Sequence, residues 1–401
     1  MLLAQSGYGR GNKIHSAFGE NLVGGVILSP KDERRERLEE CVSDLRRDYS
    51  NPWIMIDPQF YAAALNSPRD GRLPEYEYYA DHAPLSRTQF RPRQIGGYVR
   101  SCLEYQNNLP GLSFLISPGV LFEDFQDSWS QIALNLAEAS IEAHVDLGPQ
   151  APLLVTILLS EHTLRNGSGM GEYLDAISGL DVHGFYLIVS RSSSSYQAAM
   201  DVRSMENLMY FIHVLSTLND YKVVVGYSDW LGFLLHAAGA TATATATGWH
   251  QSLRQFTMAR FEPAGGGRRP RKRYSSMPLL SNPLIAPDLE DIYRTGLLRE
   301  VLSGTDYDAT LQSGPANNEN RWTDDIGCLA HWGAVGGAIA SIESQRRPVA
   351  KVAAALELIE DAQQLYGRLL HRGVNFEPQT GPNHLNSWRE SLMAFRQATS
   401  L

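Results

Sequence analysis

Short apolar runs recur along the chain from residue 24 to about residue 280. Each run is followed by a polar or glycine-rich junction and then by a segment of helix length. The runs are continuously apolar or β-branched, which is typical of parallel strands that are covered on both faces. The eight runs are 26–29, 53–56, 113–116, 153–159, 185–189, 222–225, 240–247 and 274–280.

The segments between these runs have the spacing of surface helices. Leu38, Cys41, Val42 and Leu45 mark one apolar stripe on an otherwise charged segment, 31–49. Eight strand-and-helix units in about 270 residues predict a (β/α)8 TIM-type barrel in the α/β class. A doubly wound open sheet is the rival, but no early glycine-rich phosphate loop supports it.

From residue 287 the pattern changes to helices. The clearest helix is 349–371, where apolar residues step by three or four positions. We therefore predict a barrel over residues 1–287, with inserted loops at 66–93 and 263–273, and a helical C-terminal region over 288–401. Such a region offers a surface for a protein partner.

Composition narrows the class of protein. The 401 residues are 43% hydrophobic and 20% charged, with a net charge of -9, which excludes a disordered or fibrous chain. Three widely spaced cysteines do not form a disulfide framework. The N-terminus lacks a secretion signal, and the longest weakly polar stretch, 328–342, is shorter than the roughly 20 residues that a membrane helix needs. We expect a cytoplasmic protein with no membrane association.

Candidate catalytic residues follow the strands, because a barrel builds its active site at the carboxyl ends of the strands. Asp57 ends the run WIMID, where partial burial raises a carboxyl pKa toward the range useful for proton transfer. An aspartate before proline is also a common turn residue. Glu161, which follows the run 153–159, is the second acid/base candidate, with a solvated loop position as its alternative.

Five further residues at these junctions are predicted to bind substrate. Arg191 has the planar fork that binds carboxylates and phosphates. Asp229 and His250 each begin a predicted helix, where the aspartate is also an expected helix cap. The five residues are Gln59, Arg191, Asp229, His250 and Arg254.

A basic loop stands out on this acidic chain. The sequence PAGGGRRPRKR at 263–273 contains Arg268, Arg269, Arg271, Lys272 and Arg273. Removing these five charges from the net charge of -9 leaves -14 on the rest of the chain. Dense positive charge beside flexible glycines is suited to phosphate backbones, so tRNA or DNA is an expected partner.

Motifs for cofactors and metals are missing. The chain has no Walker A loop and no dinucleotide fingerprint, and Cys328 with His331 forms only half of a zinc site. We therefore expect no cofactor and no metal.

The order of these features resembles the tRNA-guanine transglycosylase superfamily of (β/α)8 barrels. The resemblance rests on the sequence MID at 55–57, on the segment 226–240, and on LLSNPLIAPDLEDIY after the basic loop. It implies a transferase that exchanges a base in nucleic acid, with Asp57 as general base. The family's acidic nucleophile on strand seven and its zinc cluster have no counterpart here.

Three functions follow as hypotheses. The first is a diverged transglycosylase-like barrel that binds nucleic acid or modifies it by base exchange or glycosidic-bond chemistry. The second is a non-catalytic scaffold within a multiprotein complex, which the missing nucleophile favours. The third is a small-molecule hydrolase or lyase that uses Asp57 and Glu161 as acid and base.

Overall fold

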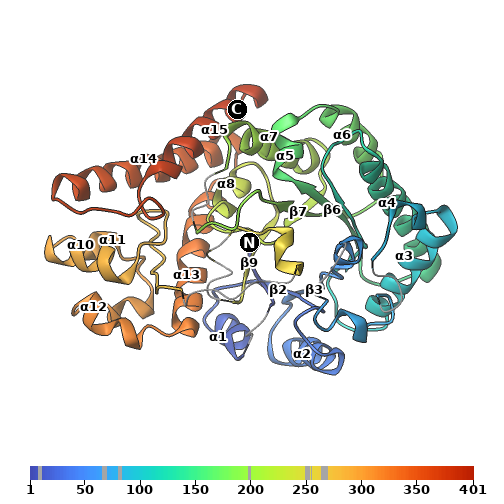
Figure 1. Cartoon of the computed structure of the whole chain (residues 1–401), viewed down its shortest axis with the longest axis horizontal. Coiled ribbons are helices and arrows are strands. Elements are labelled where there is room, and N and C mark those ends of the chain that lie inside the picture. The colour runs from blue at the N-terminus through green and yellow to red at the C-terminus, as the bar shows by residue number, and fades with distance from the viewer. Residues whose placement is uncertain are drawn as a thin grey trace.

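The strands form one parallel sheet that curls into a barrel (Figure 1). The structure is a computed structural model, and it describes residues 1–7, 11–65, 70–79, 84–196, 200–248, 253, 255–262 and 270–401. The described strands are β1 (Leu2–Gln5), β2 (Gly25–Leu28), β3 (Trp53–Ile56), β4 (Leu115–Ile116), β5 (Leu121–Phe122), β6 (Leu153–Ser160), β7 (Gly184–Ser190), β8 (Lys222–Val225) and β9 (Ala242–Ala246).

The sheet runs in the order β3-β2-β1-β9-β8-β7-β6-β4, and β5 adds to β6. The two ends of this order meet where Ser113 donates a backbone hydrogen bond to the carbonyl oxygen of Ile54 at 2.7 Å. The backbone N–H of Ile54 in turn donates to Oγ of Ser113 at 3.0 Å. The barrel is therefore nearly closed, and the predicted (β/α)8 class is confirmed.

The register determines which side chains face the barrel interior. Gln5 pairs with Ile27, which pairs with Met55, so these residues point to the same face. Two residues further along their strands, Ser29 and Asp57 point the same way. Below the strand ends the interior contains apolar side chains such as Leu3, Ile27 and Met55. At the carboxyl ends of the strands, which form the barrel mouth, polar side chains such as Ser29 and Asp57 come together.

The helices surround the strands, as Figure 1 shows for α2, α3, α4 and α6. The α-helices of the barrel are α1 (Lys13–Gly19), α2 (Arg35–Asp48), α3 (Pro92–Asn107), α4 (Ser128–Leu147), α5 (Glu161–Asn166), α6 (Met170–Ser178), α7 (Val202–His213) and α8 (Gly232–Ala237). Short 3-10 helices η1 (Phe60–Ala64), η2 (Leu73–Glu75), η3 (Arg87–Gln89) and η5 (Met258–Phe261) lie in the loops after β3 and β9, and the π-helical turn η4 (Val214–Leu218) extends α7.

The C-terminal helices pack on the outside of the barrel. They are α10 (Glu290–Arg294), α11 (Leu298–Val301), α12 (Pro315–Asn318), α13 (Asp324–Glu343), α14 (Pro348–His371) and α15 (Asn383–Thr399), with the short turns η6 (Ile285–Leu289), η7 (Asp306–Thr310) and η8 (Glu319–Arg321). The long helix α13 contacts α1, α8 and β1, and α15 contacts α7. Trp388 of α15 packs edge-on against Phe233 of α8 at a ring distance of 5.5 Å. A helical C-terminal region is thus present, and it covers part of the barrel.

The predicted set of strands needs correction at its two ends. The run 274–280 forms no strand, because Pro278 and the adjacent serines fold it into a turn with only isolated bridges, such as Ser276 with Ser281. The eighth barrel strand is instead β1, which is too short for its pattern to be recognised, and the two-residue strand β5 was also not predicted. Asp57 therefore follows the third barrel strand in chain order.

None of the described helices combines the length and the hydropathy needed to cross a membrane.

Candidate active site at the barrel mouth

Asp57 lies at the centre of a cluster of tyrosine hydroxyls and has no exposed surface. Its Oδ2 atom accepts hydrogen bonds from Tyr61 at 2.9 Å, from Tyr186 at 3.1 Å and from Tyr227 at 3.1 Å. Its Oδ1 atom accepts one from the backbone N–H of Gln59 at 3.0 Å. The carboxylate is thus held by four donors.

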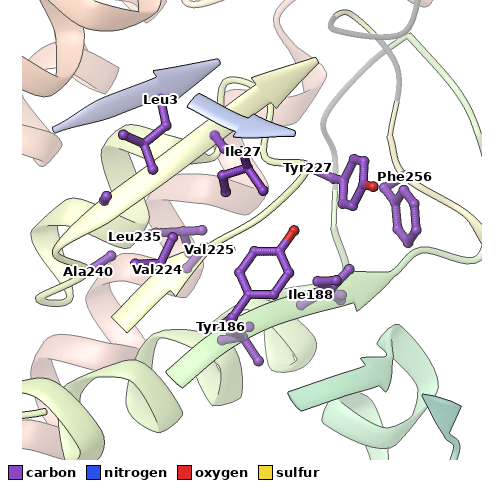
Figure 2. Close-up of a cluster of buried hydrophobic side chains, with 14 of the residues drawn as sticks. Leu3, Ile27, Tyr186, Ile188, Val224, Val225, Tyr227, Leu235, Ala240 and Phe256 are labelled. Carbon is purple, nitrogen blue, oxygen red and sulfur yellow. The ribbon is translucent and has the colours of Figure 1, made fainter. Parts of the chain in front are cut away.

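The three tyrosines come from separate parts of the chain. Tyr61 lies on η1, immediately after β3, and Tyr227 follows β8. Tyr186 lies within β7 and projects into the barrel interior, where Figure 2 shows it in one cluster of buried side chains with Leu3 and Ile27. Its hydroxyl can reach Asp57 because residue 226 is glycine: a Cβ atom there would lie 2.4 Å from the Tyr186 oxygen.

Gln59 connects this cluster to the neighbouring strand ends. Its Nε2 atom donates to Oγ of Ser29 at 2.8 Å and to the Tyr227 hydroxyl at 2.9 Å, and its Oε1 atom accepts from the backbone of Lys31 at 2.9 Å. Gln59 and Tyr227 both have left-handed backbone conformations, with φ of 53° and 52°. Such conformations cost about 1–2 kcal/mol for residues other than glycine and are concentrated at functional sites.

Burial raises the pKa of Asp57 to about 6, against the opposing effect of its four hydrogen bonds. No described cation lies within ion-pair distance of this carboxyl group. Burial and the negative charge of Asp57 also raise the pKa of Tyr61, Tyr186 and Tyr227 well above the ordinary value, so the phenols remain protonated donors. A carboxyl group with a pKa near neutrality can both accept and release a proton at physiological pH.

Aromatic side chains cover the cluster from the solvent side. The rings of Tyr227 and Phe256 stack at 4.3 Å with an angle of 19° between their planes, as Figure 2 also shows. Phe261 packs edge-on against Tyr61 at 5.3 Å. Tyr227 is 9% exposed, whereas Tyr61 is 1% exposed and Tyr186 is fully buried. Of the three tyrosines that bind Asp57, Tyr227 is thus the most exposed.

Glu161 and Arg191, both predicted site residues, bind each other. Oε2 of Glu161 accepts from Nε of Arg191 at 3.2 Å, and from the backbone and hydroxyl of Ser192 at 3.0 Å each. Burial raises the pKa of Glu161, but the charge of Arg191 and these hydrogen bonds outweigh burial, so its pKa lies below the ordinary value. Glu161 thus has the charge of an anchoring carboxylate, not the raised pKa of a general acid.

Asp229 is buried and accepts a hydrogen bond from the backbone of Leu231 at 2.9 Å, at the start of the turn that leads into α8. Burial raises its pKa. Asp229 and Arg191 line a small cavity of about 30 Å³ together with Gln255 and Phe256. The predicted binding residues His250 and Arg254 lie outside the described residues.

The basic loop is only partly described, since Arg268 and Arg269 also lie outside the described residues. Arg271 forms an ion pair with Glu377, and Nζ of Lys272 donates to the carbonyl oxygen of Glu319 at 2.8 Å. Arg273 is buried, donates to the carbonyl oxygen of Asn282 at 2.9 Å and lies over the ring of Tyr196 at 4.3 Å. These three side chains thus bind other residues of the protein, namely Glu377, Glu319 and Asn282.

Metal ligands do not gather in the described part of the chain, where no group of three or more His, Cys, Asp or Glu side chains is placed to hold an ion. The sequence pattern identified Asp57 and Gln59 but did not select Tyr61, Tyr186 and Tyr227. The tyrosines at 61 and 227 do follow strands, a signal that was available. Tyr186 lies inside a strand, where the pattern indicates only a core position.

Comparisons with known proteins leave the family open. No known protein family matches the sequence, and no curated protein matches it. Similar solved structures include a putative phosphonomutase from Burkholderia cenocepacia J2315, at 11% identity and a TM-score of 0.30, covering 61% of this chain and 85% of that chain. Another is the dihydrodipicolinate synthase from Oceanobacillus iheyensis, at 10% identity and a TM-score of 0.31, covering 99% of this chain and 96% of that chain.

The predicted resemblance to tRNA-guanine transglycosylases is wrong, and so are the transferase activity and the nucleic-acid binding that it implied. No family model matches the sequence, the transglycosylase family included, and neither solved structure named above is described as a transglycosylase. The strand that should carry the family's nucleophile, β9, instead presents Ala244 and Ala246 on the same face as Leu3 and Gln5.

Proposed function

We propose that the protein is an enzyme that transfers a proton to or from a small molecule at the barrel mouth, as a hydrolase or lyase does. Asp57 is the acid/base in this proposal. Its support is the convergence of three phenol hydroxyls on one buried carboxyl oxygen whose pKa is raised to about 6. A purely structural aspartate gains nothing from a raised pKa, because charge burial destabilises the fold.

The route of the proton follows from the order of burial. Because Asp57 is covered, the substrate reaches the hydroxyl of Tyr227, which donates to Asp57 and accepts from Gln59. A substrate C–H or O–H proton passes to the Tyr227 oxygen while the Tyr227 proton passes to Oδ2 of Asp57. The substrate retains the electron pair and uses it to expel a leaving group or to attack. The proton held on Asp57 then returns by the same route to the leaving group.

A panel of small metabolites tests this proposal. Purified full-length protein is incubated with the panel, and mass spectrometry follows the loss of each compound and the appearance of products. We expect at least one compound to be converted, with Asp57→Asn slowing conversion about 10²–10⁴-fold, which is the typical contribution of acid–base catalysis. The rate constant kcat/KM should rise through pH 6 as Asp57 ionises.

Glu138→Gln is the matched control, because it neutralises an exposed carboxylate on α4. This variant should convert the same compound at the rate of the unaltered protein. Equal conversion by Asp57→Asn, or no conversion of any panel compound by the unaltered protein, rejects the proposal.

A further inference from the structure

Arg260 holds an uncommon position at the barrel mouth. Its guanidinium carbon lies 5.2 Å from the ring centre of Tyr227 and 5.2 Å from that of Phe256, on the stack that covers Asp57. The side chain is partly buried, and burial lowers the pKa of its guanidinium. No described residue forms an ion pair or a hydrogen bond with this guanidinium.

A cation removed from water without a hydrogen-bonding partner is costly, and proteins normally pair such a group. Ring faces attract a guanidinium, but they do not accept its five N–H donors in the plane of the group, and no described side chain does so either. Those donors form a rigid fork that matches the two oxygens of a carboxylate or the oxygens of a phosphate. The arrangement therefore has the features of a binding group that is held ready for an anion.

The charges around Arg260 support the same conclusion. Nζ of Lys31 lies 5.5 Å from the ring centre of Phe261, the residue that follows Arg260. Asp32 is the carboxylate whose charge acts on Arg260, but its Oδ1 atom lies 3.6 Å from Nζ of Lys31 and its Oδ2 atom accepts from Ser29 at 3.0 Å. Among the described residues, Asp32 is thus the carboxylate that acts on both cations, and its oxygens are directed to Lys31 and Ser29.

We propose that Arg260, assisted by Lys31, binds a carboxylate or phosphate group, so that the substrate of this site is a small anion. That the bound anion is a substrate rests on the proposed function, whereas the anion site itself rests on the geometry of Arg260. An anion over Arg260 lies next to Tyr227, because the guanidinium is in contact with that ring. The remainder of the bound molecule is then within reach of the Tyr227 hydroxyl, where proton transfer begins.

Protection from chemical modification tests the site in the unaltered full-length protein. Phenylglyoxal modifies accessible arginines, and peptide mass spectrometry locates each modified residue. We expect inorganic phosphate or acetate to slow modification of Arg260 about tenfold or more, while exposed Arg203 on α7 reacts at an unchanged rate. Separate titrations with phosphate and with acetate distinguish the two anion chemistries.

Binding measured by calorimetry gives the second readout. Arg260→Met keeps the apolar contact with the two rings and should weaken binding of the protecting anion about tenfold or more, whereas Arg260→Lys should weaken it less. Arg203→Met is the control and should bind as tightly as the unaltered protein. Equal protection of Arg260 and Arg203, or unchanged binding by Arg260→Met, overturns the inference.

Asp57→Asn separates this inference from the proposed function. If the anion still protects Arg260 in this variant while conversion of the metabolite is lost, both proposals hold. If Asp57→Asn converts the metabolite normally while Arg260 remains protected, the acid/base role fails and the anion site stands. If Asp57 is essential for conversion while no anion protects Arg260, the anion site fails alone.

Discussion

Gln59 donates a hydrogen bond from Nε2 to the hydroxyl of Tyr227 at 2.9 Å, and both residues have left-handed backbones. Gln59 follows β3 and Tyr227 follows β8, and three strands separate these two in the sheet order. The bond therefore spans the barrel mouth. It positions the phenol that donates to Asp57. It also links two residues whose left-handed backbone conformations are each energetically unfavourable.

Replacing Gln59 by alanine should lower the free energy of unfolding by about 2–4 kcal/mol, because Ser29, the Lys31 backbone and Tyr227 each lose a buried partner. Gln59→Gly should be no less stable than Gln59→Ala, since glycine adopts φ of 53° without strain, which offsets its greater chain entropy. Urea denaturation measures both. Gln94→Ala on the exposed face of α3 should change stability by less than about 0.5 kcal/mol.

The pH dependence of stability should report the raised pKa of Asp57. Below about pH 4 the carboxyl group is protonated in both the folded and the unfolded protein. Between about pH 4 and pH 6 only the folded protein keeps the proton, so the free energy of unfolding falls as pH rises. A rise from 3.8 to about 6 corresponds to a loss of about 3 kcal/mol, complete above pH 6.

Asp57→Asn lacks this titration, so the difference in stability between the unaltered protein and this variant should change by about 3 kcal/mol across that window. Denaturation at a series of pH values from 4 to 7 measures it. A difference that stays constant with pH contradicts the raised pKa.

Removing a single tyrosine hydroxyl should raise the pKa of Asp57 further, because each hydrogen bond stabilises the ionised carboxylate. Tyr61→Phe, Tyr186→Phe and Tyr227→Phe are expected to act in the same direction. The infrared band of the protonated carboxyl group, assigned by its loss in Asp57→Asn, follows the titration. Tyr105→Phe is a suitable control, since Tyr105 makes no hydrogen bond with Asp57; a downward shift in any of the three variants contradicts the geometry.

Gly226→Ala should displace Tyr186 from Asp57. The added methyl group would lie 2.4 Å from the Tyr186 oxygen, and overpacking of this kind costs about 1–3 kcal/mol. Gly97→Ala on α3 has open space around the same atom and should stabilise the helix by up to about 1 kcal/mol. Thermal unfolding of both variants gives the comparison, and equal effects would show that the close approach at residue 226 is unimportant.

The pair of Glu161 and Arg191 should act as a structural anchor. Removing the carboxylate with Glu161→Gln should cost about 3–5 kcal/mol at pH 7, because the ion pair is buried and Arg191 would lose a carboxylate that it contacts. The stabilisation is present above the unfolded pKa of Glu161 and is lost as pH falls through its lower folded pKa. The exposed pair of Arg165 and Asp201 is the control, and Arg165→Gln should cost less than about 1 kcal/mol. Equal costs in urea denaturation contradict the anchoring role.

Much of the barrel was predictable because buried parallel strands carry a continuous apolar signal. Seven of the eight predicted runs coincide with strands of the sheet. The strand predicted at 274–280 is wrong. Tyr274, Leu279 and Leu280 are buried, and Tyr274 and Leu280 are hydrogen-bonded to Asp308 and His384 of the C-terminal region. The apolar residues of this turn therefore give the same sequence pattern as a buried strand. The strand Leu2–Gln5 was not predicted, because four residues are too few to show a periodic pattern.

The site was predictable only in part. Asp57 and Gln59 follow a strand directly, and barrel topology points to such positions. Tyr186 and Arg260 carry no local signal, because their roles depend on which strands are opposite each other at the mouth. Glu161 matched the same rule as Asp57, yet its partner Arg191 lies thirty residues further along the chain and gives it a different electrostatic environment.

The pairing of β1 with β9 has a consequence for how the chain assembles on the ribosome. Leu2–Gln5 is synthesised before Ala242–Ala246, yet one of its edges pairs with that strand. A nascent chain that ends before this segment leaves that edge open, since contacts between residues so distant in sequence cannot form early. The barrel therefore cannot close between β1 and β9 until residues 242–246 have been synthesised, and the edge of β1 remains unpaired until then.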